Sequence, residues 1–243
     1  MPIITTSCLV LQTYRFGDTS KILRLLTSDF GPLSALARGA LRPKSRMGGV
    51  LEPFVEGRAT LYFKPNRDLH TLSGFELIRS RQSLGTDMAR FAGASVLAEL
   101  VLRLAPAQRD DRVYATISTG LDILVEADAI AGPAVSLARI WALIGVFGFE
   151  PALDLCLSCG RPIAVGEDAR FDMSEGGLRC MDCGAGGRVL PPHELAALRR
   201  LSAGAPVSEV SMLQVGLLKE FIRVHVAEDL RIRSLDFLEA TDV

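Results

Sequence analysis

The chain has 243 residues, of which 49% are apolar and 23% are charged, so it is long enough for one large domain or for two to three small ones. These ordinary globular proportions exclude a disordered chain, a collagen-like chain and a coiled-coil rod. The net charge of −1 hides an uneven distribution, because residues 1–81 carry 12 Lys and Arg against 6 Asp and Glu, whereas the remainder is acidic. The basic first third predicts an anionic partner for that region.

The sequence shows neither a membrane-spanning segment nor a signal peptide. The longest apolar run, residues 140–149, has ten residues and is too short to cross a bilayer. The N-terminal residues MPIITTS lack a charged region followed by an apolar stretch. We therefore expect a cytoplasmic protein without a membrane partner, in which the five cysteines are metal ligands or free thiols rather than disulfides.

Residues 1–81 are predicted to form β structure. Short apolar-rich runs, separated by turns that contain Gly, Pro, Asn or Asp, cover this region without a long helical pattern between them. The runs are residues 7–14, 21–27, 33–38, 58–63 and 69–77. Their number favours a partly open five-stranded barrel of the OB type, although a small sandwich or half-barrel fits nearly as well.

The pattern changes to helices after Arg81. Apolar residues recur at helical spacing in residues 86–104, 110–126, 133–147, 191–201 and 208–230. A segment rich in Gly and Cys interrupts these helices and has no such period. We therefore expect an α+β protein of several domains. These are a small N-terminal β-barrel (1–81), a helical domain in two parts (82–150 and 191–243), and an inserted module (151–190).

Four cysteines form the strongest local motif. Cys156 and Cys159 are followed after 20 residues by Cys180 and Cys183, and a Gly follows each pair. The C-x2-C-x20-C-x2-C spacing is typical of a structural site for one Zn²⁺, in which four thiolates complete a tetrahedral shell. The intervening segment is too polar to fold around its own core, so bound metal would supply the missing stability. A redox pair or an iron–sulfur centre is a weaker alternative. Cys8, alone in a predicted strand, is expected to be a buried apolar residue.

No arrangement of residues predicts an enzyme. His70, His193 and His225 fall in different predicted elements, and none has a second His at metal-ligand spacing. The sequence has no G-x-x-x-x-G-K-[ST], no G-x-S-x-G, and no G-x-G-x-x-G within a βαβ unit. Asp110 and Asp111 are adjacent and would point apart on a helix. We therefore expect no catalytic residues.

A basic stretch at residues 37–46 is the best candidate for binding an anion. Gly39 and Pro43 break any regular element there, so its cations lie on a loop or strand exit. Arg and Lys bind phosphates, and aromatic side chains beside a positive groove bind single strands. The candidate DNA-binding residues are Arg15, Lys21, Arg24, Arg38, Arg42, Lys44 and Arg46. Phe54, Tyr62 and Phe63 are candidate stacking residues, although Phe54 and Phe63 also suit a barrel core.

Motifs spread over the whole chain resemble those of the bacterial RecO family of DNA repair proteins. They are residues 14–20 (YRFGDTS), Thr27 with Gly31, 37–40 (ARGA), 44–46 (KSR), 51–54 (LEPF), 149–156 (FEPALDLC), 176–180 (GGLRC) and 230–235 (LRIRSL). No single motif decides the resemblance, but their order and spacing across about 235 residues are specific. Leu41 departs from the pattern, since a further basic residue is common there.

The resemblance implies an N-terminal OB fold, a helical domain and an inserted zinc module. It also implies a non-enzymatic mediator of RecF-pathway recombination that binds single- and double-stranded DNA and anneals complementary strands. Its implied partners are RecR and the C-terminal tail of the single-strand-binding protein, and indirectly RecA and RecF. Such a protein works in the bacterial cytoplasm and associates with the nucleoid during repair.

Other readings of the residues stay open. A zinc-ribbon scaffold that never binds DNA would have a charge-neutral barrel surface. A nucleic-acid enzyme would need a carboxylate metal site assembled across domains. For the acidic single-strand-binding protein tail, the candidate contacts are Arg103, Arg109, Arg112 and Arg139, and the sequence does not choose among them.

Overall fold

The structure is a computed structural model that describes residues 2–45, 47–64, 67–183, 186–226 and 232–238. The chain forms two compact units. The first combines Met1–Asp87 with Leu97–Glu126, and the second combines Met88–Val96 with Ala127–Val243. The division of the chain into four parts stays a prediction.

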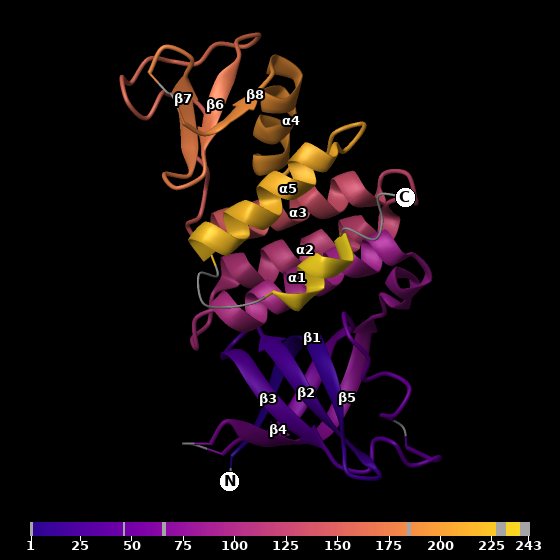
Figure 1. Ribbon diagram of the computed structural model, residues 1–243. Coiled ribbons are helices and arrows are strands. Elements are labelled where there is room, and N and C mark those ends of the chain that lie inside the picture. The colour runs from indigo at the N-terminus through magenta and orange to yellow at the C-terminus, as the bar shows by residue number, and fades with distance from the viewer. Residues whose placement is uncertain (1, 46, 65–66, 184–185, 227–231, 239–243) are drawn as a thin grey trace. The chain divides into compact units, whose positions relative to one another are not determined.

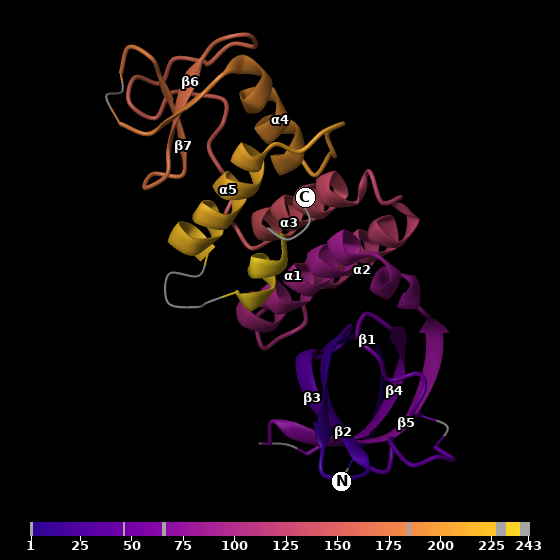
Figure 2. The ribbon, with the colours of Figure 1, turned by 45° about the vertical axis from the view of Figure 1, so that its right-hand side comes forward.

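The first unit contains a closed five-stranded barrel (Figures 1 and 2). Its strands are β1 (Ile3–Phe16), β2 (Ser20–Thr27), β3 (Gly31–Ala37), β4 (Glu56–Tyr62) and β5 (Leu69–Arg79). Their order is β1-β2-β3-β5-β4, and β4 pairs with β1 to close the sheet. The β3–β5 pair is parallel and the other pairs are antiparallel. The predicted small barrel of the OB type is confirmed, and all five expected runs are strands.

Alternation along the strands places apolar side chains inside the barrel. Cys8, Val10, Leu23 and Leu25 are fully buried in one cluster, as the sequence predicted for Cys8. Burial raises the pKa of the Cys8 thiol to about 12, so this cysteine is inert at neutral pH. The register shifts between Val10 and Gln12, which exchanges the inward and outward sides of β1 beyond that point.

A buried arginine connects the barrel to α2 (Asp111–Glu126) within the first unit. The side chain of Arg81 is 1% exposed and lies between two carboxylates, with Nε 2.7 Å from Asp122 and a terminal nitrogen 2.9 Å from Glu56. It also donates to the Phe54 carbonyl at 3.0 Å. The Ser118 hydroxyl of α2 donates to Glu56 as well. A buried charge is tolerated only when it is paired and hydrogen-bonded in this way.

The helices of the second unit pack around aromatic side chains. They are α3 (Gly132–Val146), α4 (Pro192–Ser202) and α5 (Met212–Phe221), with a π-helical turn (Ile222–Val226) and a short 3₁₀ helix (Arg233–Leu238). The rings of Trp141 and Phe221 lie 5.0 Å apart. Helix α1 (Met88–Leu104), preceded by a 3₁₀ turn (Gln82–Thr86), contributes to both units. Among the described residues, none of the helices is both long and apolar enough to span a bilayer.

The last long helix is shorter than the sequence predicted. It was expected over residues 208–230, but α5 begins at Met212, where the Ser211 side chain accepts a hydrogen bond from the Gln214 backbone. Residues 206–211 instead form an irregular connection after α4. The end of the predicted helix, at 227–230, lies outside the described residues.

Candidate nucleic-acid surface and metal site

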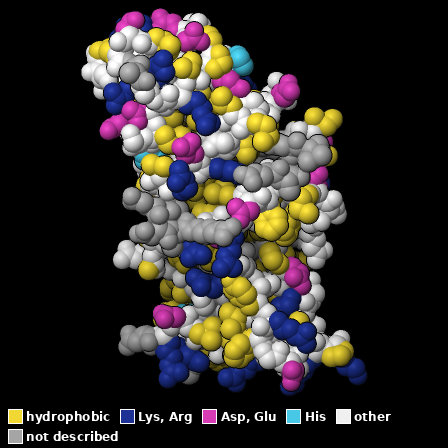
Figure 3. All heavy atoms as spheres, in the orientation of Figure 1, with side chains coloured by type: hydrophobic (Ala, Val, Ile, Leu, Met, Phe, Trp, Pro, Cys, Tyr) yellow, Lys and Arg dark blue, Asp and Glu magenta, His cyan; other side chains and the backbone are white. Residues whose placement is uncertain are grey.

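Strands β1, β2 and β3 present apolar and aromatic side chains on the outside of the barrel. Tyr14 is paired across the sheet with Ile22, and Ile22 is paired with Leu36. Their neighbours Leu23 and Ala35 are buried in the core, so this row faces outward. Tyr14 is 48% exposed. In the barrel part of Figure 3, hydrophobic side chains gather in a patch that Lys and Arg side chains border.

Four of the predicted DNA-binding cations lie at one end of the barrel. Arg15 is in register with Lys21, and Lys21 with Ala37, so Arg15 and Arg38 lie near the same end of the barrel. The loop after β3 is tied to the β1–β2 hairpin, because the Leu41 amide donates to the Thr19 carbonyl at 2.8 Å. This loop carries the remaining two cations, Arg42 and Lys44, and all four are exposed.

The loop after β3 is ordered by a tight turn at Gly39. Its φ of 68° is left-handed, a conformation that suits glycine. The Arg42 amide donates to the Gly39 carbonyl at 3.1 Å, and the Gly39 amide donates to the Ser20 hydroxyl at 3.4 Å. The backbone is therefore held by hydrogen bonds while the cationic side chains remain exposed.

Lys21 differs from the other predicted DNA-binding residues. Its side chain points into the barrel, where Nζ lies 2.8 Å from Glu52 and donates to the Leu51 carbonyl at 3.0 Å. Only 10% of this side chain is exposed. We therefore leave Lys21 out of the proposed DNA surface and assign it a structural role. Arg46 lies outside the described residues.

Arg24 lies beside a second group of cations that the sequence analysis missed. It lines a cavity of about 560 Å³ together with Lys64 and Arg67 from the β4–β5 connection. The three segments meet because β3 pairs in parallel with β5, so the start of β5 lies beside Ser34, the partner of Arg24. Lys64 and Arg67 flank a turn in the sequence, and only the OB strand order brings them to the exterior of β2.

An aromatic pair lines the same cavity. The rings of Phe63 and His70 are stacked with their centroids 4.6 Å apart, and His70 Nδ1 accepts a hydrogen bond from the Lys64 amide at 3.2 Å. Burial, and then the charge of Lys64, lowers the pKa of His70. A neutral imidazole therefore completes the stack at neutral pH.

The three predicted stacking residues occupy different environments. Phe54 is 4% exposed with a left-handed φ of 69°, so it belongs to the core and does not stack on bases. Phe63 is partly buried against His70. Tyr62 is 40% exposed on the exterior of β4. Tyr14 is not among the stacking residues that the sequence predicted, because the bulge in β1 turns it outward from the side that Cys8 and Val10 face.

The four cysteines of the inserted module converge on one point. Their sulfur atoms all lie within 4.8 Å of one another, and the Sγ atoms of Cys159 and Cys180 are 3.9 Å apart. Tetrahedral Zn²⁺ with bonds of 2.3 Å would separate two sulfurs by about 3.8 Å. The cluster therefore fits a tetrahedral metal ion, as the spacing predicted. Cys156 and Cys180 are buried, whereas Cys159 and Cys183 are exposed.

Backbone amides around the cluster favour thiolates. Hydrogen bonds from the backbone of Cys159, and then of Cys180, lower the pKa of Cys156 to about 6. The Cys180 amide lies 3.3 Å from the Cys156 sulfur. Gly160, with a φ of 71°, closes the first turn, and its amide donates to the Cys156 carbonyl. The neighbouring sulfurs of Cys180 and Cys159 raise the pKa of Cys183 to about 12, so a bound cation such as Zn²⁺ would be needed to hold all four groups as thiolates.

The inserted module has more regular structure than the sequence predicted. Strands β6 (Ala169–Asp172), β7 (Gly177–Cys180) and β8 (Arg188–Leu190) form a sheet of order β7-β6-β8. Phe171 and Leu178 are buried, and Phe171 lies 6.4 Å from the ring of Phe221 on α5. Arg199 of α4 donates to the carbonyls of Leu153 and Ile163. The module therefore completes its core with residues from the helices.

The histidines do not assemble a catalytic group. His225 Nε2 lies 2.7 Å from the Met173 carbonyl, and Nε2 of the exposed His193 is 3.9 Å from Glu194. In the described parts of the chain, the cysteine set is the only group of three or more Cys, His, Asp or Glu that could hold a metal ion.

Comparison with known proteins identifies the family. The family description "Recombination protein O N terminal" matches residues 1–81, and "Recombination protein O C terminal" matches residues 85–234. The chain belongs to the RecO family. The first RecO match covers the barrel, and the second covers the helices and the cysteine module.

Relatives that carry the RecO name match over most of their length. A DNA repair protein RecO from Anaeromyxobacter sp. is 35% identical over 206 residues, which cover 83% of this chain and 80% of the relative. Those from Heliobacterium modesticaldum and Chlorobium limicola are each 30% identical and cover 96% of this chain, and 86% and 96% of the relatives. The resemblance predicted from the motifs is confirmed.

Proposed function

We propose that this protein is a DNA repair and recombination mediator that binds single- and double-stranded DNA through the outer face and one end of its barrel. The observation that carries the proposal is the charge on that surface. None of the six described cations Arg15, Arg24, Arg38, Arg42, Lys44 and Arg67 forms an ion pair with another described residue. Cations that remain unpaired beside exposed Tyr14 and Phe16 suit phosphates and unstacked bases.

Strand annealing follows from the same surface without a catalytic group. Cations that neutralise phosphates reduce the repulsion between two strands, and a backbone contact leaves base edges free to pair. The unpaired cations also argue against the zinc-ribbon scaffold, which would require a neutral barrel surface. Membership of the RecO family supports the further proposal that the protein acts in the RecF pathway with RecR and RecF and helps to load RecA.

Arg139 is the best candidate to contact the acidic tail of the single-strand-binding protein. Arg103, Arg109 and Arg112 each lie within ion-pair distance of a nearby carboxylate. In the described part of the chain, Arg139 of α3 forms no ion pair. Burial lowers the pKa of this guanidinium, which remains charged at neutral pH. An acidic tail would supply the missing carboxylate.

For the inserted module we propose one structural Zn²⁺ held by the four cysteines. The ion would fill the coordination shell completely, so it would stabilise the module and offer no position to a substrate. The convergence of the four sulfur atoms supports this assignment. Bacterial cytoplasm, with association with the nucleoid during repair, is the location that this function requires.

The DNA-binding proposal is tested by the salt dependence of binding. We expect a variant with Arg15, Arg38, Arg42 and Lys44 all changed to Gln to lose about 3 units of the slope of log K against log salt on single strands, at roughly 0.7 per phosphate. The control variant changes Arg161, Arg188 and Arg223, exposed residues outside the barrel, to Gln and should keep the slope. An unchanged slope in the barrel variant would exclude this surface as the DNA site.

Annealing of complementary oligonucleotides coated with single-strand-binding protein, followed by fluorescence transfer, tests the function itself. We expect the wild-type protein to accelerate annealing and the barrel variant to lose this activity. Retained annealing in the barrel variant would contradict the location. Divalent-metal-dependent cleavage of the strands by pure protein would support the nucleic-acid enzyme instead.

A further inference from the structure

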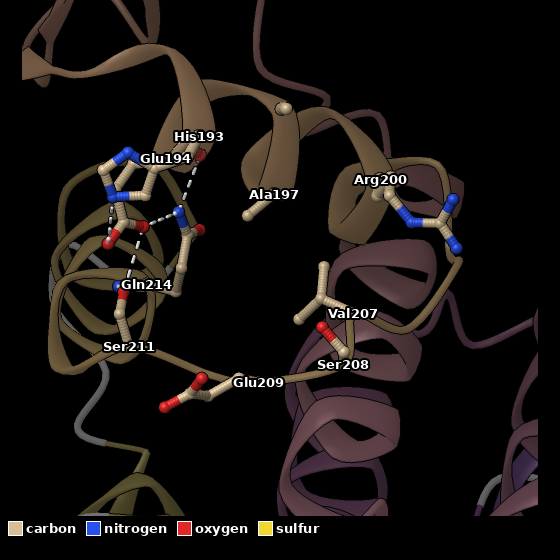
Figure 4. A pocket seen from close by; sticks show the side chains of 10 residues that line it. His193, Glu194, Ala197, Arg200, Val207, Ser208, Glu209, Ser211 and Gln214 are labelled. Atoms are coloured by element: carbon tan, nitrogen blue, oxygen red, sulfur yellow. Dashed lines mark hydrogen bonds and ion pairs between the residues drawn. The ribbon is translucent and has the colours of Figure 1, made fainter.

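The second unit contains a cavity that the proposed DNA binding does not use. It has a volume of about 680 Å³ and lies between α4, the connection after it, and the start of α5 (Figure 4). Ala197 and Val207 provide small apolar side chains in its wall, whereas Glu194, Glu209 and Gln214 provide oxygen atoms. The cavity is therefore a groove with apolar walls and hydrogen-bond acceptors.

The acceptor end of the groove is organised by Glu194. Its side chain is 11% exposed, and its Oε2 accepts from the Ser211 hydroxyl at 2.9 Å and from the Gln214 side-chain amide at 2.7 Å. Its Oε1 lies 3.9 Å from His193 Nε2, beyond hydrogen-bond distance. One oxygen of a largely buried carboxylate therefore makes no hydrogen bond within the described chain, and exposed His193 lies at the outer limit of ion-pair distance from it.

Gln214 provides a second unsatisfied acceptor at the same end. Its amide nitrogen donates to both the backbone carbonyl and the carboxylate of Glu194, which fixes the orientation of the amide. The residue is 0% exposed, and within the described chain its Oε1 has no hydrogen-bond partner. In Figure 4 the Gln214 side chain lies beside Glu194 on the wall of the groove. A buried acceptor that lacks a donor destabilises the folded protein by about 1–3 kcal/mol. A ligand that donates a hydrogen bond to it would remove this penalty.

The N-terminus of α5, which carries the partial positive charge of the helix dipole, borders the groove, but the groove is not an anion site. Glu194 already supplies the negative charge at that end, through its contacts with Ser211 and Gln214. Glu209 adds a second carboxylate to the lining. Arg200 lies six residues along α4 from Glu194, at about 9 Å, and one of its terminal nitrogens donates to the Pro206 carbonyl. The groove therefore has an acceptor end and a separate cationic end.

We propose that the groove binds one basic side chain of a partner protein at its Glu194 end. A guanidinium or ammonium group supplies several donors, which match the free oxygens of Glu194 and Gln214 and the carboxylate of Glu209. The methylene stem of that side chain packs against Ala197 and Val207. Arg200 at the other end repels a strongly polycationic segment, so the partner presents a single basic residue. The site is independent of the DNA surface on the barrel.

The test uses the full-length protein labelled with ¹⁵N and the peptide N-acetyl-Gly-Arg-Gly-amide. We expect saturable shifts of the Gln214 side-chain amide signals during titration. The same peptide with citrulline in place of arginine has the shape without the charge, and it should bind about tenfold more weakly. Equal binding of the citrulline peptide would overturn the proposal, and so would tighter binding of N-acetyl-Gly-Glu-Gly-amide.

Two variants locate the binding site. Glu209→Gln removes a carboxylate from an exposed loop without touching the core, and it should weaken arginine-peptide binding several-fold. Glu194→Gln should weaken it further. Glu175→Gln, an exposed change elsewhere in the second unit, is the matched control and should leave it unchanged. If Glu209→Gln and the control bind alike, or if Gln214 does not shift with the wild-type protein, the groove is not the binding site. DNA binding with its salt slope should remain the same in all three variants.

Discussion

The five-stranded barrel and the three-stranded sheet of the cysteine module contain very different amounts of buried apolar side chain. The barrel encloses a cluster of eleven buried residues contributed by its strands and the β3–β4 connection. The module buries mainly Ala169, Phe171, Leu178 and Leu190 from its three strands. At about 25 cal/mol for each Å² of apolar surface, such a small set contributes little. The barrel is therefore held by its core, whereas the module has little core of its own and relies on contacts with the helices and, as we propose, on a metal ion at its four cysteines.

Arginines show the same contrast between structure and function. Arg81 is buried and makes ion pairs or hydrogen bonds with Glu56, Asp122 and the Phe54 carbonyl. Its guanidinium is therefore neutralised within the protein and is not accessible to a ligand. Arg38 and Arg42 are exposed and form no ion pair with any described residue. The first kind fixes the fold, and the second kind is available to a ligand. The burial and pairing of a cation therefore separate the two roles better than its position in a basic stretch.

Removal of the metal should have the largest effect and should be confined to the second unit. We expect Cys156→Ser, or chelation of the wild-type protein, to release one Zn²⁺ and expose the strands β6 and β7. Metal binding is worth about 10–16 kcal/mol in small zinc peptides, far more than the module's core can replace. Hydrogen exchange should accelerate at Phe171 and Leu178, whereas Leu23 in the barrel stays protected.

The matched control for the metal site is Ser158→Ala, which lies between the first two cysteines. It should keep both the metal content and the exchange rates of the wild-type protein. An unchanged metal content in Cys156→Ser would remove the basis for a four-cysteine site. Loss of protection in the barrel as well would show that both sheets depend on the metal site.

Arg81→Met should have the next largest effect, on the stability of the first unit. The change leaves the carboxylates of Glu56 and Asp122 without their buried partner, and breaking such a network costs about 3–5 kcal/mol. Arg79→Met is the matched control, because Arg79 also pairs with Asp122 but is 52% exposed. It should cost less than about 1 kcal/mol. Urea unfolding measures both, and equal losses would contradict the distinction between buried and exposed arginines.

The strands of the barrel could be predicted from the sequence, whereas those of the cysteine module could not, and the reasons are physical. The barrel strands alternate with clear turns, so all five were found, and the cysteine spacing alone identified the cysteine cluster. Strand pairing, however, is set over long distances along the chain. The bulge that turns Tyr14 outward and the parallel β3–β5 pair that brings Lys64 beside Arg24 leave no local pattern. For the same reason Lys21 was assigned to the DNA surface, although its partner Glu52 lies 31 residues away.

Tyr14→Ala should weaken single-strand binding by a smaller amount than the charge changes. An aromatic side chain that stacks on a base contributes about 1–3 kcal/mol, which corresponds to roughly a 5- to 150-fold loss of affinity. The salt slope should stay the same, because no phosphate contact is lost. Phe237→Ala is the control, since Phe237 is 55% exposed in the second unit. Equal affinities for Tyr14→Ala and the wild-type protein would limit the DNA contact to the cations.

The smallest effect should be the pH dependence that His70 gives to the barrel. Burial and the charge of Lys64 lower the pKa of His70 in the folded state below its unfolded value of about 6.5. The folded protein therefore binds fewer protons than the unfolded chain. The contribution of neutral His70 to the free energy of unfolding is therefore fully present above about pH 6.5. It is lost as the pH falls through the lower folded-state pKa. His70→Gln keeps an acceptor for the Lys64 amide and cannot titrate. Urea unfolding of the two proteins from pH 7.5 to pH 5 should give a smaller decline in the variant, and identical declines would place the titrating group elsewhere.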